Sequence, residues 1–160
     1  MIFEAPTEWI SPESFPDLKD HKYIAIDLET RDPGLKARGS GALIGDGEIV
    51  GVAVAVEGWS GYYSFGHKEG NFFDEAVVMR WVKEICALPN VKLFHNAMYD
   101  VCWLRAYGVQ INGHIVDTMV MASLVDENRF HYSLNSLSID YLGQVKDETA
   151  LRAAADKAGI

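Results

Sequence analysis

The sequence contains no long hydrophobic run. Its longest apolar stretches, such as residues 49–56, are far shorter than the roughly 20 residues that a helix needs to cross a bilayer. The first residues include Glu4, Glu8 and several prolines, and they lack the basic start and apolar centre of a secretory signal. These absences predict a protein that has no membrane partner and works in the cytoplasm.

Cysteines and basic residues are also scarce. The two cysteines, Cys86 and Cys102, lie inside apolar helical patterns, which argues against a disulfide framework or a cysteine metal cluster. A net charge of −9 argues against a broad grip on duplex DNA, because that binding depends on basic residues displacing phosphate counterions. It does not exclude a nuclease, since an acidic site loaded with divalent cations attracts a phosphodiester locally.

The length and composition indicate one globular domain. The chain has 160 residues, of which 49% are hydrophobic and 23% are charged. Pro6, Pro12 and Pro16 interrupt residues 1–20, so this segment is expected to be a lead-in arm without a long helix. The domain itself is expected over residues 21–160.

Hydrophobic patterns predict an α/β fold. Strands are expected at residues 23–29, 48–57 and 61–65, with a polar loop at 31–47. The later expected elements are a helix at 75–88, a strand at 91–94, a helix at 97–107, a strand at 111–116, and helices at 118–125, 134–142 and 149–158. Three strands followed by alternating helices and strands predict a mixed central sheet, with its first three strands antiparallel, flanked by helices.

Helical spacing also predicts which side chains enter the core. In the helix at 75–88 the residues that share a face are Val77, Trp81, Ile85 and Leu88. Asn96 is expected to cap the helix at 97–107. That helix is expected to pack through Val101 and Leu104.

Two carboxylates end the first predicted strand. Asp27 and Glu29 are two residues apart, so they point to the same face of the sheet. A close acidic pair is costly without a cation, and ligand sites gather at the carboxyl ends of strands in open α/β sheets. The pair therefore indicates a hard-metal site. The alternative is a solvent-facing strand end, because Asp-x-Glu is a very short pattern.

A second acidic position follows at the start of a predicted helix. Asn96 and Asp100 are four residues apart and share one face of that helix. A first-turn acid that is favoured by the helix dipole is an equally good explanation of Asp100 alone. The order of the elements along the sequence is more specific than either acidic pattern alone. It runs from a strand that ends in Asp-x-Glu through two strands, a helix and a strand to Asn-x-x-x-Asp.

These motifs resemble those of a known family. Ile-Asp-Leu-Glu-Thr at 26–30 and His-Asn-Ala-Met-Tyr-Asp at 95–100 resemble the first and second motifs of the DEDD-superfamily 3′→5′ exonucleases. Residues 117–119 and 131–137 resemble the proofreading domains of phage and bacterial family A DNA polymerases, the DNA polymerase I type. The resemblance covers nearly the whole chain after His21. It implies a ribonuclease H-like fold and two-metal hydrolysis of 3′-terminal phosphodiester bonds.

The resemblance also implies a set of site residues. Asp27, Glu29 and Asp100 would hold two divalent cations, Mg²⁺ or Mn²⁺, with Asp27 bridging them. One cation would lower the pKa of the attacking water and the other would stabilise the leaving 3′ oxygen. Thr30 and Asn96 match positions near the terminal nucleotide of a single-stranded DNA 3′ end, although a turn hydroxyl and a helix cap are alternative roles.

Other positions matter less or depart from the family. Asp117 is interpreted as a helix-capping residue rather than a metal ligand. The family's third motif, Tyr-x-x-x-Asp or His-x-x-x-x-Asp, does not follow the second motif within these residues. We therefore expect the sequence to be a piece of a longer chain, truncated before that motif, with the polymerase domain on the same chain. Residues 31–35 also differ from those that usually follow the first motif.

Two alternative functions stay open on the sequence alone. A non-catalytic module of the same fold would bind nucleic acid or a partner protein, and the missing third motif favours it. A ribonuclease D-like enzyme would cleave RNA, since such enzymes share the first two motifs.

Overall fold

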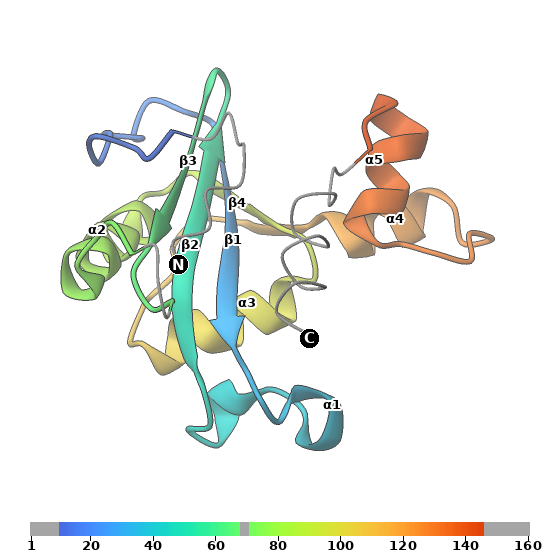
Figure 1. Ribbon diagram of the computed structural model, residues 1–160. Coiled ribbons are helices and arrows are strands. Elements are labelled where there is room, and N and C mark those ends of the chain that lie inside the picture. The colour runs from blue at the N-terminus through green and yellow to red at the C-terminus, as the bar shows by residue number, and fades with distance from the viewer. Residues whose placement is uncertain (1–9, 68–70, 146–160) are drawn as a thin grey trace.

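A mixed five-stranded sheet forms the centre of the computed structural model, which describes residues 10–67 and 71–145 (Figure 1). The strands lie in the order β3-β2-β1-β4-β5, and β1, β2 and β3 pair antiparallel, as predicted. β4 runs parallel to β1, and β5 runs parallel to β4. The bounds are β1 Tyr23–Arg31, β2 Glu48–Val56, β3 Trp59–Ser64, β4 Val91–Phe94 and β5 Ile115–Asp117.

The helices connect and flank these strands. Their bounds are α1 Leu35–Arg38, the 3-10 helix η1 Gly41–Leu43, α2 Glu75–Ala87, α3 Ala97–Ala106, α4 Thr118–Val125 and α5 Leu134–Leu142. The strand predicted at 111–116 is shorter and later than expected, and the loop at 31–47 contains two short helical turns that the sequence did not reveal. The helix predicted at 149–158 lies outside the described residues. None of the helices within the described ranges is long and apolar enough to cross a membrane.

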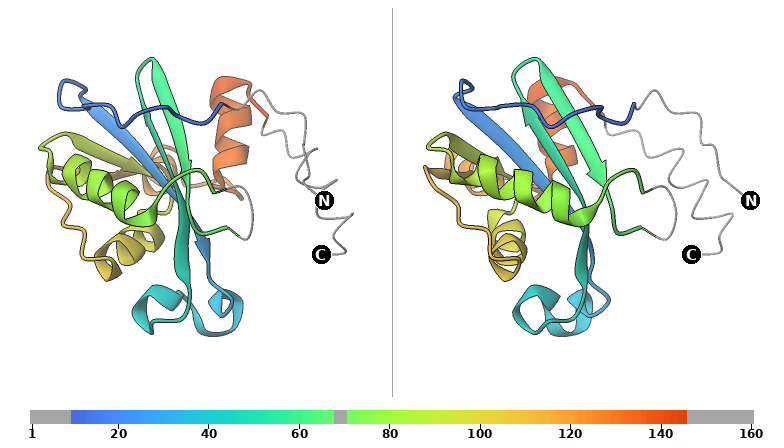
Figure 2. Two further views of the ribbon diagram at one scale, coloured as in Figure 1. Left: turned by 60° about the vertical axis from the view of Figure 1, so that its left-hand side comes forward. Right: turned by 90° about the vertical axis from the view of Figure 1, so that its left-hand side faces the viewer.

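The main core lies between the sheet and helices α2 and α3, which cover the same face (Figure 2). Ile24, Ile26 and Leu28 alternate with more exposed residues along β1 and point into this core. On α2 the buried positions include Val78 rather than Val77, whose side chain is 40% exposed, so the predicted core face of this helix was partly wrong. Each fully buried aliphatic side chain contributes about 1.5–3 kcal/mol to folding.

The described end of the lead-in segment, residues 10–20, packs against the same core without regular secondary structure. The Phe15 ring stacks on the Tyr63 ring with the centroids 4.9 Å apart. The indole N–H of Trp81 on α2 donates a hydrogen bond to the Pro16 carbonyl over 3.1 Å. This segment therefore closes one end of the core.

A buried lysine ties β4 to its neighbours. Lys92 is 0% exposed, and its ammonium donates to the carbonyl oxygens of Leu88, Asn90 and Asn112, the last two at 3.0 and 3.1 Å. Burial lowers the pKa of Lys92. The three carbonyls belong to the end of α2, to the loop before β4 and to the loop between α3 and β5, so one side chain ties together three segments around the strand that leads into α3.

Candidate active site

Asp27 and Glu29 lie on the face of β1 that points away from α2 and α3. Both are exposed, whereas the intervening Leu28 is buried in the core. In the β1–β2 register, Asp27 pairs with Ala53 and Glu29 with Gly51. The two carboxylates are therefore next-nearest neighbours on one face, as the sequence predicted.

Asp100 reaches the same strand from the first turn of α3. Its side chain is buried, and its Oδ1 accepts a hydrogen bond from the Leu28 backbone N–H over 3.1 Å. Burial raises the pKa of Asp100 to about 7; the Leu28 N–H works against this shift, and the negative charge of Asp27 adds to it. The second motif thus contacts the strand of the first motif between Asp27 and Glu29.

Asp117 holds the start of α3, so the expectation that Asn96 would cap this helix was wrong. Asn96 has a left-handed backbone (φ 67°, ψ 54°) and makes no side-chain cap. The Asp117 carboxylate instead accepts from the N–H groups of Asn96 and Ala97 at 3.0 and 2.8 Å, and it also caps α4 by accepting from Met119 at 2.9 Å. Burial alone would raise the pKa of Asp117, but these backbone donors outweigh it and lower the pKa. The Asn96 side chain, which does not cap the helix, is exposed beside the site.

Thr30 lies near the carboxyl end of β1 and pairs with Ile49 of β2. A β-bulge separates Glu29 from Thr30 in the pairing with β2. The extra residue, Val50, lies on β2, and bulges of this kind are frequent beside active sites. The Thr30 hydroxyl lies 2.6 Å from the hydroxyl of Tyr99, the residue before Asp100 on α3. The two motifs are therefore joined by a side-chain contact as well as by the Asp100–Leu28 contact.

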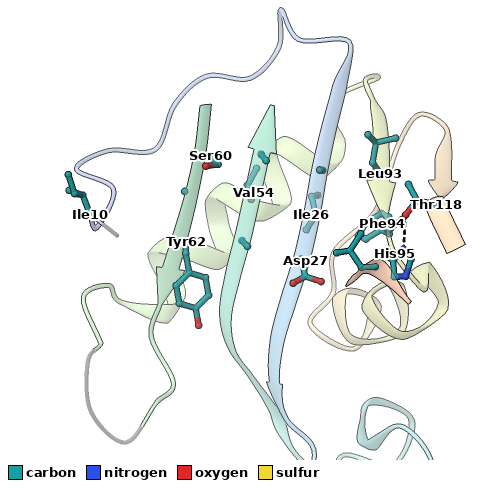
Figure 3. Close-up of a pocket in the computed structure, with 15 residues that line it drawn as sticks. Ile10, Ile26, Asp27, Val54, Ser60, Tyr62, Leu93, Phe94, His95 and Thr118 are labelled. Carbon is teal, nitrogen blue, oxygen red and sulfur yellow. Dashed lines mark hydrogen bonds between the residues drawn. The ribbon is translucent and has the colours of Figure 1, made fainter. Parts of the chain in front are cut away.

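The sequence did not single out Tyr62 on β3, which also belongs to this face. Tyr62 pairs with Ala53, which pairs with Asp27, so the three residues form one row across the sheet (Figure 3). Its hydroxyl lies over Gly51, where a Cβ would be only 2.2 Å away. Burial raises the pKa of Tyr62 to about 12, with further contributions from the charges of Glu29 and then Asp27. Only the strand register reveals this proximity, because β3 is remote from β1 in the sequence.

A pocket of about 630 Å³ opens on this face next to Asp27 (Figure 3). Small side chains of β1 and β2, including Ala25 and Ala53, form much of its floor. Tyr62 lies on one side of it and His95 on the other, where His95 Nδ1 lies 2.9 Å from the Thr118 hydroxyl. The pocket leaves room for a ligand above the first carboxylate.

The donor atoms of the three acids fit a hard divalent cation in kind, because Mg²⁺ and Mn²⁺ prefer carboxylate oxygens. A cation would also offset the repulsion between Asp27 and Asp100 that contributes to the raised pKa of Asp100. Within residues 10–67 and 71–145, however, no group of three or more His, Cys, Asp or Glu side chains is close enough to form a preorganised metal site. The acids would therefore have to adjust when cations bind.

Comparison with known proteins identifies the fold and the family. Residues 7–158 match the 3′-5′ exonuclease family of family A DNA polymerases. The chain belongs to this family. A DNA-directed DNA polymerase of Pseudomonas phage M6 is 29% identical over 161 aligned positions, which cover 96% of this chain and 24% of the phage protein. DNA polymerase DpoZ of Acinetobacter phage SH-Ab 15497 is 27% identical over 84% of this chain and 19% of its own length.

Solved structures of other proteins share the fold. The POL domain of Pol1 from M. smegmatis superposes with a TM-score of 0.57 at 17% identity, covering 86% of this chain and 22% of that one. Escherichia coli RNase D gives a TM-score of 0.57 at 15% identity over 82% of this chain and 31% of its own. These likenesses confirm the predicted ribonuclease H-like fold. The family match confirms the predicted 3′→5′ exonuclease domain, and the chain spans about a quarter or less of the phage polymerases.

Proposed function

We propose that this exonuclease domain proofreads for a longer family A DNA polymerase by removing nucleotides from a single-stranded DNA 3′ end. In this proposal the polymerase domain lies on the same chain, which agrees with the small share of the phage polymerases that these 160 residues span. The observation that carries the proposal is the contact of Asp100 with Leu28, because it joins the two acidic motifs at one point of the sheet.

Each acidic residue has a separate part in the proposed reaction. Asp27, Glu29 and Asp100 would hold two Mg²⁺ or Mn²⁺ ions, which activate the attacking water and stabilise the leaving 3′ oxygen when bound. Asp27 would be the ligand shared by the two ions. Asp100 is held in place by the Leu28 N–H, and it must give up its proton when a cation binds because its pKa is near neutrality.

Two further residues would bind the terminal nucleotide. Thr30 follows Glu29 directly at the bulge, and Asn96 is exposed at the start of the helix that carries Asp100. Both therefore flank the acids rather than the core. The third family motif, which supplies the fourth acid, would follow residue 160 in the longer chain. Residues 21–160, together with the packed segment 10–20 ahead of them, would then form the exonuclease domain without its last part.

Trimming of labelled oligonucleotides by the full-length protein tests this function. We expect Mg²⁺-dependent shortening of single-stranded DNA from its 3′ end, with Asp27→Ala or Glu29→Ala reducing the rate by about 100-fold or more, because transition-state charge loses its stabilisation. Glu84→Gln on the exposed side of α2 is a matched control that should keep full activity. Faster trimming of RNA than of DNA would favour the ribonuclease D-like alternative. Binding of 3′ ends without trimming would favour the non-catalytic module.

A further inference from the structure

A chain of hydrogen bonds runs from Thr30 into the loop that follows β1. The Thr30 hydroxyl contacts the Tyr99 hydroxyl at 2.6 Å, and the Tyr99 hydroxyl donates to Asp32 Oδ2 over 3.2 Å. The same Oδ2 accepts from the Gly41 backbone N–H over 3.0 Å. The chain therefore links the ends of both acidic motifs to the loop at 31–47.

The donors and acceptors in this series of hydrogen bonds can be assigned in only one consistent way. Asp32 Oδ2 accepts from both the Gly41 backbone N–H and the Tyr99 hydroxyl, so Asp32 is the acceptor end. Tyr99 has a single hydroxyl proton, which it gives to Asp32. The Tyr99 oxygen must then accept the proton of Thr30. As a result, the Thr30 hydroxyl proton points inward, and its remaining lone pair can only accept.

The surroundings of Asp32 reinforce this direction. Its second oxygen, Oδ1, is buried and has no hydrogen-bond partner among the described residues. The Gly41 N–H and the Tyr99 hydroxyl are therefore the donors that Oδ2 depends on, and loss of the Tyr99 hydroxyl would leave this carboxyl group with one fewer donor. At the outer end, Thr30 immediately follows Glu29 at the bulge. The acceptor that results is next to the acids of the active site.

We propose that Asp32 and Tyr99 are positioning residues that fix the Thr30 hydroxyl as a hydrogen-bond acceptor for the 3′-hydroxyl of the terminal nucleotide. The site would then favour strand ends that carry a hydroxyl donor at the 3′ position over ends that lack one. This inference rests on the proposed function, since it assumes that the terminal nucleotide binds beside Thr30.

Paired substrates that differ by one oxygen test the inference in the full-length protein. We would measure kcat/KM for the same oligonucleotide with a 3′-hydroxyl end and with a 3′-deoxy end, and take the ratio of the two values for each variant. The ratio is expected to exceed one in the wild type and to fall about fivefold in Tyr99→Phe, Asp32→Asn and Thr30→Val, as for loss of one hydrogen bond. In a protein that already carries Thr30→Val, adding Tyr99→Phe should not lower the kcat/KM ratio any further.

Tyr107→Phe is the matched control for general loosening of the region. Tyr107 follows α3 directly, and its hydroxyl accepts from the Ile49 backbone N–H over 3.1 Å. This variant therefore loses a comparable hydrogen bond that is not part of the Thr30–Tyr99–Asp32 series. Its ratio should equal that of the wild type. Because both substrates meet the same enzyme sample, a partly unfolded variant lowers both rates and leaves the ratio unchanged.

The outcomes separate failure of this inference from failure of the proposed function. A ratio in Tyr99→Phe equal to that of the wild type would overturn the inference, and so would an equal fall in Tyr107→Phe. In both cases Mg²⁺-dependent trimming would persist and the proposed function would stand. If the wild type trims neither end with Mg²⁺, the proposed function itself fails.

Discussion

Replacing Asp100 by Asn should make the metal-free protein more stable at pH 8 and hardly change it at pH 4. The cause is the buried position of this carboxyl, which raises its pKa from 3.8 to about 7 together with the charge of Asp27. An asparagine in the same place cannot ionise, and its side-chain oxygen can still accept the Leu28 N–H. The substitution therefore removes the charge and keeps the hydrogen bond.

The sign follows from proton linkage. The folded protein holds the Asp100 proton to a higher pH than the unfolded chain does, so the free energy of unfolding falls as the pH rises from about 4 to about 7. The pKa of Asp100 is about 7 in the folded protein against 3.8 for an ordinary Asp, and a tenfold change in proton affinity corresponds to about 1.4 kcal/mol. The difference between Asp100→Asn and the wild type should thus grow from near zero at pH 4 to at most about 4 kcal/mol at pH 8.

Urea unfolding of both proteins in a chelator, at a series of pH values, measures this difference directly. Other titrating groups are common to the two proteins and largely cancel. Adding Mg²⁺ at pH 8 should then stabilise the wild type and leave Asp100→Asn almost unchanged, because a cation that binds the folded state raises its stability by mass action. Trimming activity of the variant should be lost.

Asp117→Asn provides a control with the opposite sign. Its backbone donors lower the pKa of Asp117, so the stability it contributes is present above its unfolded pKa and is lost as the pH falls through the folded one. This variant should be less stable than the wild type at pH 8. A stability difference for Asp100→Asn that does not change between pH 4 and pH 8 would refute the assignment of a buried, charge-repelled carboxyl at this position.

Three further outcomes are expected. Lys92→Met should lower the free energy of unfolding by about 2 kcal/mol in urea titrations, because three buried or partly buried carbonyls lose their donor; unchanged stability would contradict this role. Gly51→Ala should destabilise by about 1–3 kcal/mol through the clash with the Tyr62 hydroxyl, and Tyr62→Ala should relieve most of that loss in a double-mutant cycle. Residues 1–160 alone should trim a labelled single-stranded 3′ end slowly or not at all beside the full-length protein, since Mg²⁺ needs a full ligand set; equal, Asp100-dependent activity in both would place a fourth ligand inside these residues.

The sequence predicted the fold well because its elements are marked locally. The run of apolar residues that ends in Asp27 and Glu29 has the period of a strand, and the helix that starts at residue 97 follows a short strand and a polar junction. Such signals depend on neighbours in the chain. The same locality explains why the two acids of β1 could be assigned to one face of the strand from the order of residues alone.

The remaining features depend on contacts that are remote in the sequence. The true cap of α3 is Asp117, which lies 21 residues after Asn96 and reaches it only because β4 and β5 are parallel neighbours. The burial of Asp100 and the place of Tyr62 also follow from strand order rather than from local pattern. On α2 the core includes Val78 rather than Val77, together with the predicted Trp81 and Ile85, because the exact edge of a helix face is set by what packs against it.

The packing of residues 10–20 against the core decides where the domain begins as a folding unit. A chain that started at His21 would keep every strand and helix, yet it would lose the aromatic stacking on Tyr63 and leave the Trp81 indole N–H without its carbonyl partner. The exposed surface would be a cluster of rings at one end of the sheet. For any fusion or excised version of this exonuclease, residues 10–20 therefore belong with the domain, and linkers should be attached before them.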